Sequence, residues 1–161
     1  MSSDGRPALE IPDAAGLRLA VAATRWHADI VDVLVERALA VAAKSGAEVP
    51  TVVRVPGTVE LPVVCQELAR THDAVVALGL VVRGGTPHFE YVCSAATDGL
   101  ARIAVDKGVA VGFGLLTCDT DEQALDRAGL EGSKEDKGYE ATSAALLTAQ
   151  TLRTIKRGYE T

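Results

Sequence analysis

The chain has 161 residues, of which 48% are hydrophobic and 24% charged, so it matches an ordinary globular domain that buries a full core without metal or disulfide staples. Its net charge of −6 and the lack of a basic run argue against nucleic acid or an acidic membrane surface as a partner. No apolar run approaches the roughly 18 residues of a spanning helix, and the sequence shows no signal peptide pattern. The number of cysteines is odd, and none of them (Cys65, Cys93 and Cys118) forms a CxxC pair. These features predict a reducing, cytoplasmic setting.

Short apolar runs define the predicted strands. Residues 1–16 are poor in apolar side chains and contain two prolines, so we expect an extended arm before one domain at residues 17–161. Within that domain the runs are almost continuously apolar, which is typical of parallel strands covered on both faces. The predicted strands are residues 19–24, 51–55, 74–80 and 109–117.

Longer segments with helical spacing follow each strand. A stop signal at Gly46 ends the first, and capping boxes are expected at Thr120/Gln123 and Ser133/Asp136. The predicted helices are residues 29–45, 60–71, 88–107, 121–128 and 134–157. This alternation predicts an α/β fold with a four-stranded parallel sheet between two helical layers, for which the flavodoxin-like strand order is one common solution. Ligands of such sheets bind beyond the carboxyl ends of the strands.

The first two strand ends carry ambiguous signals. Trp26, the only tryptophan, is either a core or rim residue or a flat platform for a heteroaromatic ring. The segment from Thr58 to Glu60 is either a turn that feeds a helix or a set of backbone amides and a carboxylate that binds polar edges. Local sequence alone favours the structural interpretation at both places.

The third strand end is the most informative segment, GLVVRGGTPHFEYVC at residues 79–93. Gly84 and Gly85 leave the backbone bare, Thr86 suits an N-cap and Pro87 a first helical position. A helix N-terminus beside bare backbone is suited to anions. His88 then falls in the first helical turn, where its imidazole can move protons near such an anion.

Other patterns are weak. Gly79 and Gly84 have the spacing of a P-loop, but Gly85 stands where the lysine belongs, which excludes a nucleoside triphosphatase. Residues 112–114 are half of a dinucleotide fingerprint and lie inside a strand. Local sequence makes Arg127 a partner of a helix C-terminus. No spacing suggests a metal site or a nucleophilic serine.

Four blocks of the sequence carry a resemblance to a known family: PGTVELPVV, ALGLVVRGGTPHFEYVC, GFGLLTCDTDEQALDRAG and EDKGYEAT. Together with the Trp26-His27 pair, they make the chain from Leu17 to about Arg153 resemble the lumazine synthases. The second block is the most specific of the four. The resemblance implies a condensation of 5-amino-6-(D-ribitylamino)uracil with 3,4-dihydroxy-2-butanone 4-phosphate, the penultimate step of riboflavin biosynthesis, with no metal or redox cofactor.

The resemblance also implies a role for each site residue. His88 would transfer protons. The phosphate would be bound by Gly85, Thr86 and Arg127. The pyrimidine substrate would be bound by Trp26, Thr58, Val59, Glu60, Leu80, Val81, Val82 and Phe113.

The family assembles as rings, so we expect a homo-oligomer, a pentamer, although the family includes icosahedral 60-mers built from such rings. Residues 130–136 look longer than in the shell-forming members, which favours the free pentamer. Phe113 precedes the end of its strand, and the following helix should run back and carry Arg127 toward the opposite edge of the sheet. A neighbouring subunit would then supply both residues to each site.

Two other functions remain open at this stage. One is a non-catalytic binding or shell protein with the same fold. The other is a related riboflavin-forming enzyme that dismutates lumazine itself.

Overall fold

The computed structural model describes residues 10–158 and contains one parallel sheet. Its strands lie in the order β2-β1-β3-β4, which is the flavodoxin-like order without a fifth strand. The strands are β1 (Leu19–Thr24), β2 (Thr51–Val55), β3 (Ala74–Val82) and β4 (Ala110–Cys118). The predicted strands are therefore confirmed, with small shifts at the ends of the last two.

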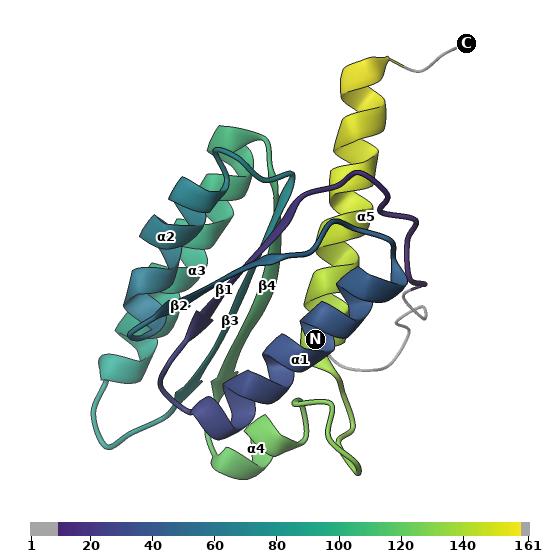
Figure 1. Ribbon diagram of the computed structural model, residues 1–161. Helices are drawn as coiled ribbons and strands as arrows, with labels where there is room; N and C mark the ends of the chain where they lie inside the picture. Colours follow the sequence, from purple (N-terminus) through teal and green to yellow (C-terminus); the bar gives the residue numbers. More distant parts are fainter. Residues whose placement is uncertain (1–9, 159–161) are drawn as a thin grey trace.

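Helices cover both faces of this sheet, which confirms the predicted layers. Figure 1 shows α1 and α5 on one face and α2 and α3 on the other, with α4 beneath the carboxyl end of β4. The helices are α1 (Ala28–Lys44), α2 (Leu61–Leu68), α3 (His88–Lys107), α4 (Asp121–Leu125) and α5 (Lys137–Arg157), and a 3-10 turn, η1, spans Thr58–Glu60.

Alternate residues of each strand feed two separate cores, as the pleat of a strand requires. Val21 and Val76 pack with α1 and α5, whereas Ala22 and Val75 pack with α2 and α3. The inner strands β1 and β3 have no polar face because helices cover both faces, which explains their continuous apolar runs. All four carboxyl ends meet at one edge of the sheet.

The glycines inside β4 serve close packing rather than ligand binding. A Cβ atom on Gly112 would lie 2.6 Å from the Ala141 carbonyl oxygen of α5, and one on Gly114 would lie 2.3 Å from Leu78 Cδ2. A larger residue at Gly112 would push α5 off the sheet, and one at Gly114 would displace the Leu78 side chain of β3. This geometry accounts for the half fingerprint at residues 112–114.

Three helix boundaries differ from the predicted ones by three residues, and the first is the end of the helix predicted at 60–71, which lies at Leu68. The helix predicted at 121–128 ends at Leu125, and the last begins at Lys137 because Asp136, not Ser133, caps it by accepting from the Tyr139 amide at 2.9 Å. The Ser133 hydroxyl instead donates to the Leu125 carbonyl at 2.5 Å. Periodicity could not reveal that this serine closes a loop.

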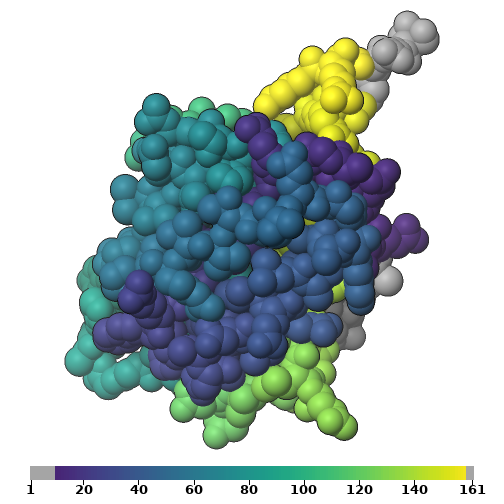
Figure 2. Space-filling view, in the orientation of Figure 1, coloured from purple at the N-terminus to yellow at the C-terminus, as the bar shows by residue number. Residues whose placement is uncertain are grey.

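Residues 10–16 contain neither helix nor strand, in keeping with the predicted arm, and residues 1–9 of that arm lie outside the described residues. Ala14 is buried in the core, and its amide donates to the Ser45 carbonyl at 2.8 Å. In residues 10–158, no helix is long and apolar enough to cross a membrane. Figure 2 shows the last turns of α5 projecting beyond the rest of the molecule.

Candidate active site

A cavity of about 340 Å³ lies at the carboxyl ends of β1, β2 and β3 and the start of α3. Its walls combine apolar side chains with a few polar groups, as small-molecule sites do. Most of the residues to which the sequence assigned a role line this one cavity. They are Trp26, Thr58, Val59, Glu60, Leu80, Val81, Val82, Thr86 and His88.

Trp26 stands at the mouth of this cavity with 71% of its surface exposed. A core tryptophan would be covered, so the structure removes the core interpretation. The next residue, His27, has φ 55° and ψ 46° and is the one non-glycine residue with positive φ in residues 10–158. A left-handed conformation costs a non-glycine residue on the order of 1–3 kcal/mol and is typical of functional sites. This turn sets the direction of Trp26 as the chain leaves β1.

The turn after β2 forms the opposite wall. Thr58 is buried, and Val59 is exposed to the cavity although it is apolar. The Glu60 side chain accepts from the Gly57 amide at 2.9 Å, which fixes its carboxylate beside the turn. The wall therefore presents one apolar and one acidic group, a pairing suited to a ligand with both a ring and hydroxyl groups.

The loop after β3 is open on its outer side. Nothing lies within 4 Å of the place where a Cβ atom would stand on Gly84 or Gly85. Gly85 lines a shallower hollow next to the main cavity, and Thr86 lines both. The N-cap predicted at Thr86 is wrong by one residue, since Pro87 caps α3 and the Thr86 hydroxyl accepts from the His88 amide at a long 3.5 Å. His88 remains in the first turn, exposed at the cavity.

Arg83, which the sequence reading left without a role, connects three elements around this loop. Its Nε donates to Asp119 after β4 at 2.6 Å, and its Nη1 pairs with Glu90 in the first turn of α3. The guanidinium also lies 4.3 Å from the centre of the Phe89 ring. The hydrogen bonds and nearby charge of Arg83 lower the pKa of the Glu90 carboxyl, so this pair stays charged at neutral pH.

Phe113 and Arg127 lie elsewhere, in a second cavity of about 630 Å³ beside β4, the edge strand. Phe113 is 45% exposed. The expectation that the helix after β4 carries Arg127 to the opposite edge is wrong, because α4 has five residues and leaves Arg127 lining the same cavity as Thr117, next to the end of β4. Its Nη1 donates to the Gln123 carbonyl at 2.8 Å, which is the local helix partnership that the sequence favoured.

The chain matches the family model described as 6,7-dimethyl-8-ribityllumazine synthase over residues 16–153. It belongs to the lumazine synthase family. The curated relatives with this name include proteins of Saccharopolyspora erythraea, 64% identical over 99% of this chain and 96% of the relative, and Frankia casuarinae, 62% identical over 97% and 98%. A Streptomyces coelicolor relative is 56% identical over 96% and 97%. The resemblance seen in the four sequence blocks is thus confirmed.

The second cavity of this lumazine synthase family member contains a further cation that the sequence reading missed. Lys137, the first residue of α5, lies 2.5 Å from a Glu135 carboxylate oxygen and 2.8 Å from one of Glu140. Burial lowers the pKa of Lys137, but the bonds from the two carboxylates outweigh it and raise the pKa. Only the fold reveals this half-buried cation with two acidic partners beside Arg127, because Asp136 begins the helix that brings them together.

The cysteines read as structural. Burial raises the pKa of Cys65 to about 12 and also raises the pKa of Cys93 and Cys118, so none of the three thiols is activated as a nucleophile. All three are free. Across residues 10–158, no group of three or more His, Cys, Asp or Glu side chains is placed to hold a metal ion.

Proposed function

We propose that the chain condenses 5-amino-6-(D-ribitylamino)uracil with 3,4-dihydroxy-2-butanone 4-phosphate to 6,7-dimethyl-8-ribityllumazine, as a penultimate step of riboflavin biosynthesis. The observation that carries this proposal is the single cavity that gathers an exposed tryptophan, an open glycine loop and a histidine in a first helical turn. Membership of the lumazine synthase family supports it. Neither a metal nor a redox cofactor is needed for the reaction.

In this proposal the residues divide the two substrates between them. Trp26 stacks on the pyrimidinedione ring, residues 58–60 bind the ribityl chain, and residues 80–82 bind the ring edge largely through backbone. Gly85 and Thr86 bind the phosphate through the open backbone of their loop. Phe113 covers the ring, and Arg127 pairs with the phosphate.

The chemistry needs an amine, a ketone and a leaving phosphate in contact. The primary amine of the pyrimidine attacks the ketone and loses a first water to form an imine, phosphate is then eliminated, and the second, ribityl-bearing amine closes the ring with loss of a second water. His88 stands beside the phosphate loop, where it can exchange protons with the reacting groups. Much of the acceleration comes from holding both substrates in one pocket, which replaces a bimolecular encounter by an intramolecular one.

Mixing the purified protein with both substrates tests the activity. The absorbance of the lumazine product should appear with both substrates and not with either one alone. No product would favour the non-catalytic shell protein with the same fold. Riboflavin formed from lumazine alone would favour the dismutating enzyme.

We further infer a cytoplasmic homo-oligomer, a ring of five subunits. Three free cysteines support the reducing compartment. Exposed apolar side chains such as Val63 and Tyr91 on α2 and α3, at 67% and 74% exposure, support burial by neighbouring subunits. Light scattering should give the mass of a pentamer, whereas the mass of a 60-mer would indicate the icosahedral shell and that of a monomer would contradict the ring.

Trp26→Ala should weaken binding of the pyrimidine substrate about tenfold while hardly changing binding of the sugar phosphate, because a stacking face is lost. Trp26→Phe should restore most of the binding. Titration calorimetry with each substrate separately measures both. The exposure of Trp26 means that neither variant should unfold, so equal weakening for both substrates would show that the ring does not stack on it.

Arg83→Gln should raise KM for the sugar phosphate several-fold and change the affinity for the pyrimidine little. The reason is that the bonds to Glu90 and Asp119 hold the phosphate loop between two elements. Arg83→Lys should restore only part of the loss, because an ammonium cannot make the forked contacts of a guanidinium. Arg70→Gln, which removes an exposed pair with Glu67 on the last turn of α2, is the control, and an equal effect there would make the role of Arg83 nonspecific.

A further inference from the structure

A third cavity, of about 440 Å³, lies at the opposite end of the sheet from the candidate active site. Its residues come from just before β1, β3 and β4 and from the last turns of α3 and α5. Since β3 has nine residues, the two ends of the sheet lie roughly 25–30 Å apart at about 3.3 Å per residue. A ligand here would not touch the substrates.

This cavity is unusually basic for an acidic protein. Of the 16 Lys and Arg residues of the chain, whose net charge is −6, five line it, together with a single carboxylate, that of Asp73. The sequence shows no basic run because these cations come from separate segments that only the fold brings together. The five are Arg18, Lys107, Arg153, Lys156 and Arg157.

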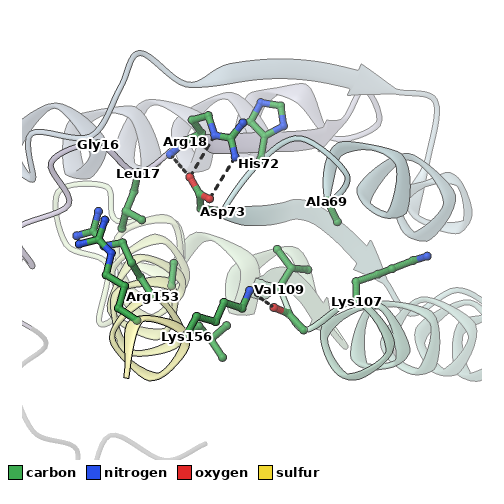
Figure 3. Close-up of a pocket in the computed structure, with 14 residues that line it drawn as sticks. Gly16, Leu17, Arg18, Ala69, His72, Asp73, Lys107, Val109, Arg153 and Lys156 are labelled. Carbon is green, nitrogen blue, oxygen red and sulfur yellow. Dashed lines mark hydrogen bonds and ion pairs between the residues drawn. The ribbon is translucent and has the colours of Figure 1, made fainter. Parts of the chain in front are cut away.

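The one carboxylate is already paired. Asp73 accepts from the Arg18 backbone amide at 2.8 Å and from its guanidinium at 3.3 and 3.4 Å, as Figure 3 shows. Burial raises the pKa of Asp73, but the bonds from Arg18 and the nearby charge of Arg153 outweigh it and lower the pKa. The Arg18–Asp73 pair has no net charge, so the charge of the cavity depends on the other four cations.

None of those four cations forms a salt bridge within residues 10–158. Arg153 donates to the Ala15 carbonyl at 3.0 Å, and Lys156 reaches across to the Gly108 carbonyl at 3.4 Å (Figure 3). Lys107 and Arg157 lie at the carbonyl ends of α3 and α5. Each of these helix ends carries about half a negative charge. Four cations against about one negative charge leave a clear positive surplus.

Apolar side chains form the floor between these cations. Leu17 and Val109 are buried there, and Leu152 is half-buried on α5. An apolar floor with charged groups at its rim suits a small organic molecule that carries anionic groups. Long lysine and arginine side chains on several elements can close around such groups, and a phosphate ester offers up to two charges at neutral pH.

We infer that this cavity is a second anion site, which binds a small organic phosphate at the amino ends of the strands. This site shares no residue with the phosphate-binding residues proposed for the condensation, so the inference can be tested separately from that activity.

Equilibrium dialysis with radiolabelled pyrophosphate tests this site on the assembled protein. The wild type should bind pyrophosphate at this cavity whether or not the candidate active site also binds it. Arg153→Gln/Lys156→Gln should lose this binding or weaken it at least tenfold. The control Arg70→Gln/Arg102→Gln removes the same charge from exposed positions paired with Glu67 and Asp106 and should bind like the wild type.

A second measurement uses the unaltered protein, so it does not depend on the variants folding. Pyrophosphate should slow the acetylation of Lys107 and Lys156 several-fold, as read by peptide mass spectrometry, while Lys44, exposed on α1, should react at the same rate throughout. Unchanged acetylation rates at all three lysines when pyrophosphate is added, or equal losses of binding in Arg153→Gln/Lys156→Gln and in the charge-matched control, would each overturn the inference.

Discussion

Replacing His88 by alanine should leave the fold intact and lower kcat by about tenfold or more. His88 is the first residue of α3 and is exposed at the cavity, so the substitution removes no core contact, and alanine favours a helix. The expected loss comes from the proton transfers that accompany amine attack, phosphate departure and ring closure. Stopped-flow or steady-state assays at saturating concentrations of both substrates measure it.

A structural role for His88 would give a different signature. If the imidazole transfers protons, kcat should depend less on pH in the variant than in the wild type. Added imidazole should restore part of the activity by entering the space that the side chain left. Turnover equal to the wild type at saturating substrates would remove His88 from the mechanism.

Much of the fold followed from the sequence because burial leaves a simple pattern. The four apolar runs marked β1 to β4 within two residues at either end, and the inner strands β1 and β3 are almost entirely apolar because both of their faces are covered. The helix boundaries near residues 125–137 did not follow. There the Ser133 hydroxyl and the Asp136 carboxylate each bond backbone groups of a loop, and periodicity does not report such bonds.

The candidate site divides in the same way. The glycines, Thr86 and His88 stand close together in the sequence, so local chemistry could place them at the carboxyl end of β3, where Gly84, Thr86 and His88 line the cavity, and that they bind an anion stays a prediction. The contacts of Arg83 with Asp119 and of Lys137 with Glu135 and Glu140 depend on which elements the topology places side by side. The left-handed backbone conformation of His27 cannot be predicted from the residue type at that position. These features required the fold.

The proposed active site needs residues from two separate cavities of the chain. Trp26 and His88 line one cavity of the chain, while Phe113 and Arg127 line another beside the edge strand β4. Phe113 lies five residues before Cys118, the last residue of β4, or about 16 Å back along the strand. An edge strand is open to a neighbour on its free side. Packing the second cavity of one subunit against the first cavity of the next, head to tail around a closed ring, would complete every site.

Co-expressing His88→Ala with Arg127→Ala should therefore give more activity than either variant has alone. Arg127→Ala should itself lose about 10- to 100-fold, the usual effect of removing a charged partner of a phosphate. In a random equal mixture, about one interface in four joins an intact His88 to an intact Arg127. Activity should rise toward that fraction of the wild type. Rings of each variant assembled separately and then combined without exchange of subunits are the control and should keep only the residual activity of the single variants. Native mass spectrometry of differently tagged subunits establishes that mixed rings formed, and if they form while activity stays at the level of the single variants, each site is built from one chain.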